Sequence, residues 1–414
     1  MTLPTVRLLV FVLAYVALAF PMLLRVRVSR AAIAAAGAAA MLLVGRLSPR
    51  AAYAAIDGDV LVFLFGVLVV AGYLERAGVF EWVAGTLLGR VTDTPHRLLA
   101  VLIGAAGLTS ALCMNDTICL VLTPLVLATI RPLRLPPTPY LLGVALAANV
   151  GSAMAITGNP QNMIIGLASH IGFAAFLAAL ALPALGGLVI VYGVLAWLFR
   201  RELSGVLALP PPAAPPVLDR RLAATVVVVF SGMLLGWVVG APLALVSLVG
   251  AAAISLLGGR NPMPVLARLD WSLLVFFAGL FVIVGGVRDV AFVQQGTAAA
   301  VHALNGTPLR DATVVSGAML VLSNLVSNVP AVLLWRHVVP ALPDARFLWL
   351  VLAMSSTFAG NFTLLGSLAS LIVAERARAA GAELTFGDFL KAGIPVTLLT
   401  MAWGIGALVL TAGR

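Results

Sequence analysis

A run of polar side chains interrupts a long apolar segment at LCMNDTICLVLTP, residues 112–124. Asn115, Asp116 and Thr117 stand where an uninterrupted membrane helix would carry leucine. A carboxylate inside a bilayer costs at least about 2.5 kcal/mol on insertion scales, and it is a functional candidate by default. Either Asp116 is protonated for part of the time, or a cation sits beside it. Both options predict proton or sodium chemistry, and the alternative is that Asp116 caps the next helix.

Three further polar clusters lie at membrane depth. Beside SALCMNDT (110–117), they are NVGSAMAITGNPQN (149–162), SNLVSNVP (323–330) and SSTFAGNFTLLGS (355–367). None contains Lys, Arg or His, so no cationic side chain within them could neutralise Asp116. Pro330, Gly158 and Pro160 are helix breakers, and a break exposes backbone groups to a bound solute or ion. The alternative is that these residues only join helices, for about 0.6 kcal/mol each.

These clusters predict a binding site for a small solute and an ion. Asn115 and Asn328 would bind from two helix tips, Gly158 and Gly366 would open two broken helices, and Asp116 would carry the coupling proton or bind sodium. No cofactor and no metal other than sodium is predicted, because the histidines are scattered and Cys113 and Cys119 point to different helix faces. The full predicted set is Asn115, Asp116, Thr117, Gly158, Asn159, Asn162, Ser327, Asn328, Asn361, Thr363, Gly366 and Ser367.

Composition identifies the environment of these residues. Of 414 residues, 62% are hydrophobic and 10% are charged, whereas a soluble domain is about a quarter charged. The chain is therefore predicted to be an all-α polytopic membrane protein. Its net charge of +10 is attributed to arginines that orient the segments in the membrane rather than to a nucleic-acid partner.

Apolar windows predict about ten membrane-spanning helices. Segments 98–131 and 311–335 have polar centres and are predicted to be re-entrant hairpins, while 138–168 and 345–374 are predicted to be broken helices. Most of the 25 Lys and Arg residues then lie on the inner side of a bacterial inner membrane, with both termini outside. The windows are 5–24, 31–46, 59–75, 138–168, 172–199, 221–239, 242–259, 271–287, 345–374 and 388–411.

The two halves of the chain are similar to each other. A shift of 213 positions superimposes the two hairpin asparagines and pairs Asp57 with Asp270, Gly66 with Gly279 and Ser110 with Ser323. An odd number of crossings in each half would make the second half run inverted, as in many secondary transporters. The predicted organisation is a first repeat at 1–199, a cytoplasmic linker at 200–220 and a second repeat at 221–414.

Four motifs resemble the ion transporter superfamily: NDTICLVLTP, TGNPQNMIIG, SNVPAVLL and GNFTLLGSLASLIVAE. That superfamily includes the arsenite/antimonite permeases, the citrate-transporter-like permeases, the melanosomal P protein and the divalent anion–sodium symporters. The resemblance covers nearly the whole chain. It implies a homodimer with a scaffold domain, a mobile transport domain, two re-entrant hairpins and elevator-type alternating access.

The motifs do not select one substrate. The divalent anion–sodium symporters carry Ser-Asn-Thr at both tips, whereas this chain has Met-Asn-Asp-Thr at 114–117 and Ser-Asn-Val-Pro at 327–330. The Asn-Asp pair is closer to the arsenite permeases, and 360–367 is closer to the P protein and to bacterial anion permeases. We expect a secondary active transporter of an anion or oxyanion, coupled to protons or sodium. The alternatives are a sodium-coupled di- or tricarboxylate symporter and a sodium/proton antiporter.

Two other classes of function are less favoured. A channel would need a continuous pore, which oligomeric rings usually provide. An enzyme would need a catalytic constellation, and the sequence has no HExxH or GxSxG motif and no paired catalytic residues at one depth. The chain is therefore expected not to be an enzyme, and its partners are a small anionic or oxyacid solute and the lipid bilayer.

Overall fold

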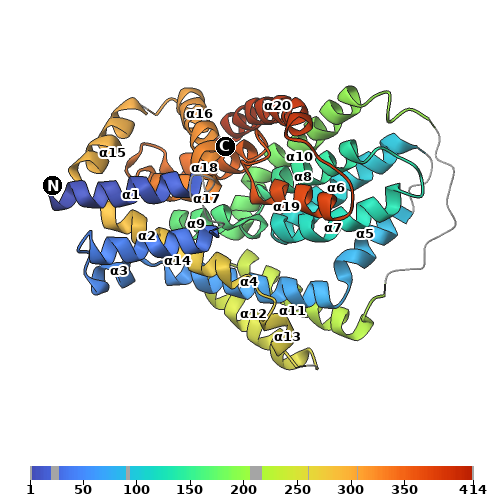
Figure 1. Ribbon diagram of the computed structural model, residues 1–414, viewed down its shortest axis with the longest axis horizontal. Coiled ribbons are helices and arrows are strands. Elements are labelled where there is room, and N and C mark those ends of the chain that lie inside the picture. Colours follow the sequence, from blue (N-terminus) through green and yellow to red (C-terminus); the bar gives the residue numbers. More distant parts are fainter. Residues whose placement is uncertain are drawn as a thin grey trace.

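The chain folds into helices (Figure 1), and several of them begin directly after a capping side chain. Asp57 and Asp270, which the shift of 213 positions pairs, cap α4 and α14 by accepting from the backbone N–H of Val60 and Leu273 at 3.1 Å. The computed structural model describes residues 2–19, 28–89, 94–205, 217–259, 261–304 and 306–412, and every regular element in these ranges is a helix.

The first half of the chain contains α1 (Leu3–Ala19), α2 (Arg30–Leu43), α3 (Pro49–Ala55), α4 (Gly58–Arg76), α5 (Val79–Gly89), α6 (Pro95–Leu112), α7 (Asn115–Ile130), α8 (Pro137–Ser152), η2 (Ile156–Gly158), α9 (Pro160–Ser169) and α10 (Phe173–Leu198). The second half contains α11 (Arg220–Val238), α12 (Leu243–Leu257), α13 (Met263–Leu266), α14 (Trp271–Val287), α15 (Ala291–Ala303), α16 (Pro308–Val326), α17 (Asn328–Trp335), η3 (Val339–Ala341), α18 (Ala345–Ala359), α19 (Leu368–Ala379) and α20 (Phe386–Ala412).

Six of these helices are long and apolar enough to cross a membrane: α4, α6, α10, α11, α16 and α20. A seventh candidate is α14 together with α15, which are bent by 90° at a short break. The expected multi-pass, all-helical architecture is therefore confirmed at this level. The end of the predicted span 5–24 and most of the predicted linker 200–220 lie outside the described residues.

Both predicted hairpins begin a few residues earlier in the structure than expected, so their first helices are longer. The helices α6 and α16 begin at Pro95 and Pro308, a few residues before the predicted starts, because each follows a threonine and carries proline in its first turn. With 18 and 19 residues they are long enough to cross by themselves. The helix pairs α6–α7 and α16–α17 are called hairpin 1 and hairpin 2 below, and their re-entrant character stays a prediction.

A frame of helices joins the two halves of the chain. The frame consists of α1, α2, α4, α11, α12 and α14, in which α4 packs on α12 and α2 packs on α14. These two contacts are related by the same shift of 213 positions. A Cβ atom on Gly66 would lie 2.5 Å from the Ser247 carbonyl, and one on Gly279 would lie 2.7 Å from the Ala34 carbonyl. Only glycine permits so close an approach of two helix backbones.

The bundle contains the remaining long elements, α6 to α10 and α16 to α20. Within it α6 packs on α8, α16 on α18 and α10 on α20, while α7 of the first half packs on α19 of the second. In Figure 1 the frame helices α2, α4, α12 and α14 run along the lower left of the molecule, and the bundle lies above and to the right. The polar clusters lie inside this bundle, at the ends of α6, α8, α16 and α18.

Candidate substrate and ion site

Hairpin 1 turns at Cys113 and Met114, which separate α6 from α7. Asn115 follows at the start of α7 and is 4% exposed. Its side-chain oxygen accepts from the N–H of Asp116 at 3.0 Å, and its amide nitrogen donates to Asn149 Oδ1 at 2.8 Å. The predicted break is therefore present, and Asn115 points from it into the bundle.

Hairpin 2 turns at one residue, Ser327, whose φ of +76° is uncommon for a non-glycine residue. Asn328 begins α17 and is buried. In the amide orientation that satisfies its neighbours, Asn328 donates to the carbonyls of Ser356 at 3.1 Å and Gly366 at 3.3 Å. Asn328 therefore joins hairpin 2 to the second broken helix.

The first broken helix divides into α8 and α9 around the turn η2. Asn159 caps α9, because its Oδ1 accepts from the N–H of Asn162 at 2.9 Å. Asn162 then donates to the carbonyls of Ser152, Ala153 and Ala155 at 3.1–3.2 Å. The Ser152 and Ala153 carbonyls are at the end of α8 and have no partner within that helix, and the Ala155 carbonyl lies in the turn that follows. Asn159 and Asn162 thus stabilise the break itself.

The second broken helix divides into α18 and α19 around residues 360–367. Asn361 is fully buried and donates to the Leu146 carbonyl of α8 at 3.1 Å. Thr363 donates to Asn324 Oδ1 on α16 at 2.9 Å. Gly366 lies against the same oxygen, which would be 2.7 Å from a Cβ atom at that position. The second break is therefore held between hairpin 2 and α8.

Asn149 connects these elements and was not among the predicted site residues. Its side chain is 1% exposed and lies in the middle of the bundle on α8. Its Oδ1 accepts from Asn115 at 2.8 Å and from Ser367 at 2.9 Å. Its Nδ2 donates to Asn361 Oδ1 at 2.8 Å and to Ser370 at 3.4 Å. The amide network, defined as Asn115, Asn149, Asn361, Ser367 and Ser370, contains no charged side chain.

The predicted site residues thus fall into three neighbouring groups. The first group is the amide network. The second group is Asn159 and Asn162, and it contacts α18 because Asn159 donates to the Thr357 hydroxyl at 3.2 Å. The third is Asn328, Thr363 and Gly366 around hairpin 2. Thr117 and Ser327 join none of these groups, and their side chains make no hydrogen bond within the described ranges.

Asp116 lies at the edge of the amide network. It is in the first turn of α7, but its carboxylate forms no hydrogen bond or close ion pair with any described residue. Asp116 therefore does not cap α7 through a hydrogen bond. Arg30, at the start of α2, attracts this carboxylate, and Asp270 repels it. Arg30 lies outside the four polar clusters, so the expectation that no cationic side chain within them could neutralise Asp116 is unchanged.

Several buried oxygens in and near the polar clusters have no hydrogen-bond partner among the described residues. Ser110 Oγ and Ser323 Oγ, which the shift of 213 positions pairs, precede the hairpin tips by about one helical turn. The Asn162 Oδ1 atom is also without a partner. Unpartnered oxygens are candidate ligands for a hard cation such as sodium. In the described ranges no three His, Cys, Asp or Glu side chains gather to hold another metal.

The variant Gly158→Ala tests whether the first break is needed for function. A Cβ atom there would lie 2.1 Å from the Ser152 carbonyl, so the turn must open and the hydrogen bonds of Asn159 and Asn162 must rearrange. We expect solute uptake into proteoliposomes to be lost. The control is Gly104→Ala in α6, because a Cβ atom there would have no atom within 4 Å apart from the neighbouring backbone of its own helix. Equal uptake by the two variants would contradict the role of the break.

An apolar, all-helical chain whose interior holds paired broken helices and uncharged polar groups is a membrane transporter by class. Residues 11–355 match the family model described as citrate transporter. The chain belongs to this citrate transporter family, within the ion transporter superfamily, as the motifs predicted.

Named relatives span almost the same length. The silicon efflux transporter LSI3 of Oryza sativa subsp. japonica is 33% identical over 459 residues, covering 93% of each chain. The uncharacterized transporter Rv2684 of Mycobacterium tuberculosis is 29% identical and covers 95% of each chain. The putative transporter arsB of Dictyostelium discoideum is 24% identical, covering 92% of this chain and 88% of its own.

Solved structures with a similar fold include that of a bacterial transporter. It is the crystal structure of the Alcanivorax borkumensis YdaH transporter, described as having an unusual topology. Its TM-score with this chain is 0.56, with 17% sequence identity, and the match covers 86% of this chain and 85% of that one. This likeness concerns the fold alone.

Proposed function

We propose that this protein is a secondary active transporter of a small weak oxyacid or its oxyanion. The observation that carries the proposal is the amide network. It joins hairpin 1 to both broken helices, and all of its members are amides or hydroxyls. Such groups donate and accept hydrogen bonds, so they can exchange their mutual contacts for contacts with a solute that carries several hydroxyl groups.

The charge of the solute follows from the same network. A multiply charged anion would need positive partners in a buried site, and the network offers none. Dissolved silicon and trivalent arsenic are neutral hydroxy acids at neutral pH, so neither needs a counter-charge. The rice relative, a silicon efflux transporter, favours this class of solute.

Coupling would run through Asp116 or through bound sodium. The Asp116 side chain forms no hydrogen bond with a described residue, and its carboxylate is attracted by Arg30 and repelled by Asp270, so a proton on it would change the local charge balance. Sodium would instead bind oxygens near the tips, among them Ser110 and Asn115 on hairpin 1 and Ser323 and Asn328 on hairpin 2. Both options keep the coupling ion beside the solute, as transporters with broken helices do.

The wider architecture is proposed on the same basis. Residues 1–199 and 221–414 would form two inverted repeats, supported by the paired helix caps and the reciprocal glycine contacts of the frame. The frame would be the scaffold and the bundle the mobile domain of an elevator. A homodimer in a bacterial inner membrane, with both termini outside, completes the proposal.

A second candidate function is sodium-coupled transport of citrate or another carboxylate, which the citrate transporter family model favours. Because the network lacks a cationic side chain, citrate would bind together with sodium. A sodium/proton antiporter of the same superfamily is the third candidate, and it would move no organic or oxyacid solute.

Flux measurements in proteoliposomes distinguish these functions. Arsenite, silicic acid and citrate are each offered under an imposed proton gradient and, separately, an imposed sodium gradient. We expect arsenite or silicic acid flux that follows the proton gradient and exceeds the flux in protein-free vesicles. Citrate uptake that follows sodium would select the second candidate, and cation exchange without any solute flux would select the third.

A further inference from the structure

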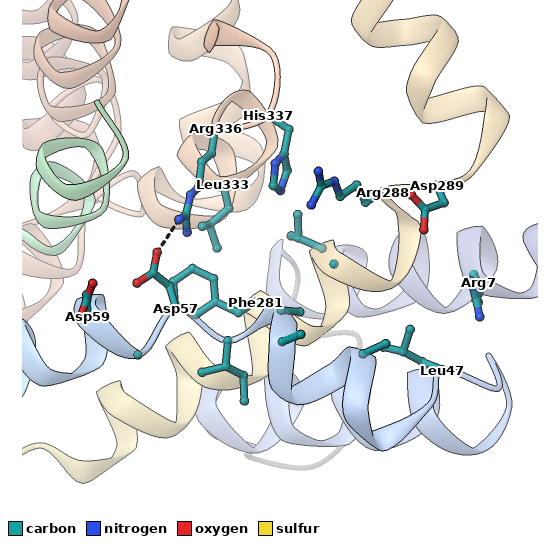
Figure 2. A pocket seen from close by; sticks show the side chains of 17 residues that line it. Arg7, Leu47, Asp57, Asp59, Phe281, Arg288, Asp289, Leu333, Arg336 and His337 are labelled. Atoms are coloured by element: carbon teal, nitrogen blue, oxygen red, sulfur yellow. Dashed lines mark hydrogen bonds and ion pairs between the residues drawn. The ribbon is translucent and has the colours of Figure 1, made fainter. Parts of the chain in front are cut away.

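Two cavities of about 670 Å³ each lie between the frame and hairpin 2. The first extends over α3 and α14, and the second extends along the turns before α10 and α12. Both cavities are lined by Asp57, Asp59, Arg336 and His337, so they adjoin each other at these residues, which are called the shared wall below. Figure 2 views the first cavity and shows Arg336 reaching Asp57 across it.

An ion pair between Asp57 and Arg336 lies in the shared wall. Asp57 uses one oxygen to cap α4 and the other to bind the guanidinium group. The side chains are 17% and 24% exposed, so the pair is partly shielded from solvent. Arg336 directly follows α17, and its guanidinium carbon lies 5.6 Å from the ring centre of Phe281 on α14. The C-terminal end of α17 is therefore bound to two frame helices.

The N-terminal end of α17 is bound to the frame by a different contact. Tyr15 of α1 is 5% exposed, and its hydroxyl donates to the Pro330 carbonyl at 3.2 Å. Pro330 is in the first turn of α17, two residues after Asn328. This helix has only 8 residues, so the contacts of Tyr15 and Asp57 together hold both of its ends.

Hairpin 1 lacks both contacts at the equivalent positions. The residue equivalent to Tyr15 is Val228, which is 71% exposed. The residue equivalent to Arg336 is Thr123, whose hydroxyl donates to the Cys119 carbonyl of its own helix. An apolar cavity of about 180 Å³ lies instead between Phe230 of α11 and the residues around the tip of hairpin 1. In the described part of the chain, these contacts bind both ends of α17 to the frame, whereas the equivalent positions do not bind α7 to it.

We propose that Tyr15 and Asp57 are positioning residues that clamp α17 to the frame and so set the side from which Asn328 is reached. This clamp rests on the proposed function, because a transporter must expose its site alternately to each side. Partly shielded ion pairs and single hydrogen bonds are strong enough to favour one arrangement and weak enough to break during each cycle. Release of the clamp lets hairpin 2 move relative to α1 and α4.

The test measures how often α17 leaves the frame. Ala331 is fully buried on α17, so the variant Ala331→Cys reacts with a thiol reagent only when the helix is released. Adding Asp57→Asn removes the charge but keeps a good helix cap. We expect Asp57→Asn to raise the labelling rate about tenfold. The loss of this partly shielded ion pair should have an effect between those of losing an exposed pair and losing a buried pair. Adding Tyr15→Phe is expected to give about a threefold rise through the loss of one hydrogen bond.

The control is Asp59→Asn, two residues away, because Asp59 lines both cavities and forms no ion pair with a described residue. Arg336→Gln should behave like Asp57→Asn, and Arg336→Lys should restore most of the slow labelling. A labelling rate in Asp57→Asn equal to that in Asp59→Asn would overturn the clamp. An equal rise at the buried native Cys113 and Cys119, measured without Ala331→Cys, would indicate general loosening and would also overturn it.

Labelling needs no solute and no ion gradient. A labelling result that contradicts the clamp can therefore be distinguished from a failure of the proposed transport function, which the flux measurements assess. The protein could transport a solute actively while the labelling rate at Ala331→Cys stays unchanged by Asp57→Asn and Tyr15→Phe. That result would support the transporter class and exclude the clamp.

Discussion

Replacing Asn149 by leucine is expected to abolish solute uptake and to lower the stability of the folded protein. Leucine has the same number of side-chain heavy atoms in the same branched arrangement but no polar atoms, so Asn115, Asn361 and Ser367 lose the partner that joins them. A buried group left without a partner costs about 1–3 kcal/mol, although hydrogen bonds between membrane helices average about 0.6 kcal/mol. We expect a total loss of about 2–4 kcal/mol on this basis.

Thermal unfolding in detergent and uptake into proteoliposomes measure the two effects. The control is Asn261→Leu, because Asn261 is exposed in a loop and its side chain accepts only from the Met263 N–H. That variant should retain uptake. Full uptake by a folded Asn149→Leu protein would exclude the amide network as the binding site.

Replacing Asp116 by asparagine is expected to remove gradient-driven uptake while leaving solute exchange between equal solutions. Asparagine keeps the size and polarity of the side chain, but it can neither bind a proton nor neutralise sodium. The attraction to Arg30 and the repulsion from Asp270 disappear together, so the fold should tolerate the change. Uptake under a proton gradient should fall to the level of protein-free vesicles.

The matched control is Asp289→Asn, an exposed carboxylate beside the first cavity. It should retain gradient-driven uptake, because Asp289 is remote from both hairpin tips along the chain. Sodium-driven citrate uptake that survives in Asp116→Asn would remove Asp116 from coupling and would favour the carboxylate symporter.

The breaks in the helices could be predicted because local sequence causes them. Asn115, Pro160 and Asn328 stand at or beside positions where a helix begins, and each follows a short polar run inside an apolar segment. The span predicted at 271–287 coincides with α14 because Asp270 caps it and Arg288 follows it. Such signals act within a few residues, and the surrounding fold does not override them.

The contacts between clusters could not be predicted in the same way. Asn149 is one polar residue in an otherwise apolar stretch of α8, and only the packing of α7 and α19 on α8 gives it four partners. Arg30 is far from Asp116 in sequence and lies outside the polar clusters, so the sequence does not indicate that it acts on Asp116. The helix α15 was not predicted either, because its mixed composition, AFVQQGTAAAVHA, resembles no membrane span.

The reciprocal packing of the frame has a consequence for biosynthesis. Because α2 rests on α14 and α4 rests on α12, neither half of the chain can bury its own frame helices. The first half therefore leaves the ribosome with uncovered glycine faces at Gly37 and Gly66 and must wait in the bilayer for α12 and α14. Two fragments divided in the linker should assemble only when they are made together, and a ribosome that stops after α10 should leave a product for membrane proteases to degrade.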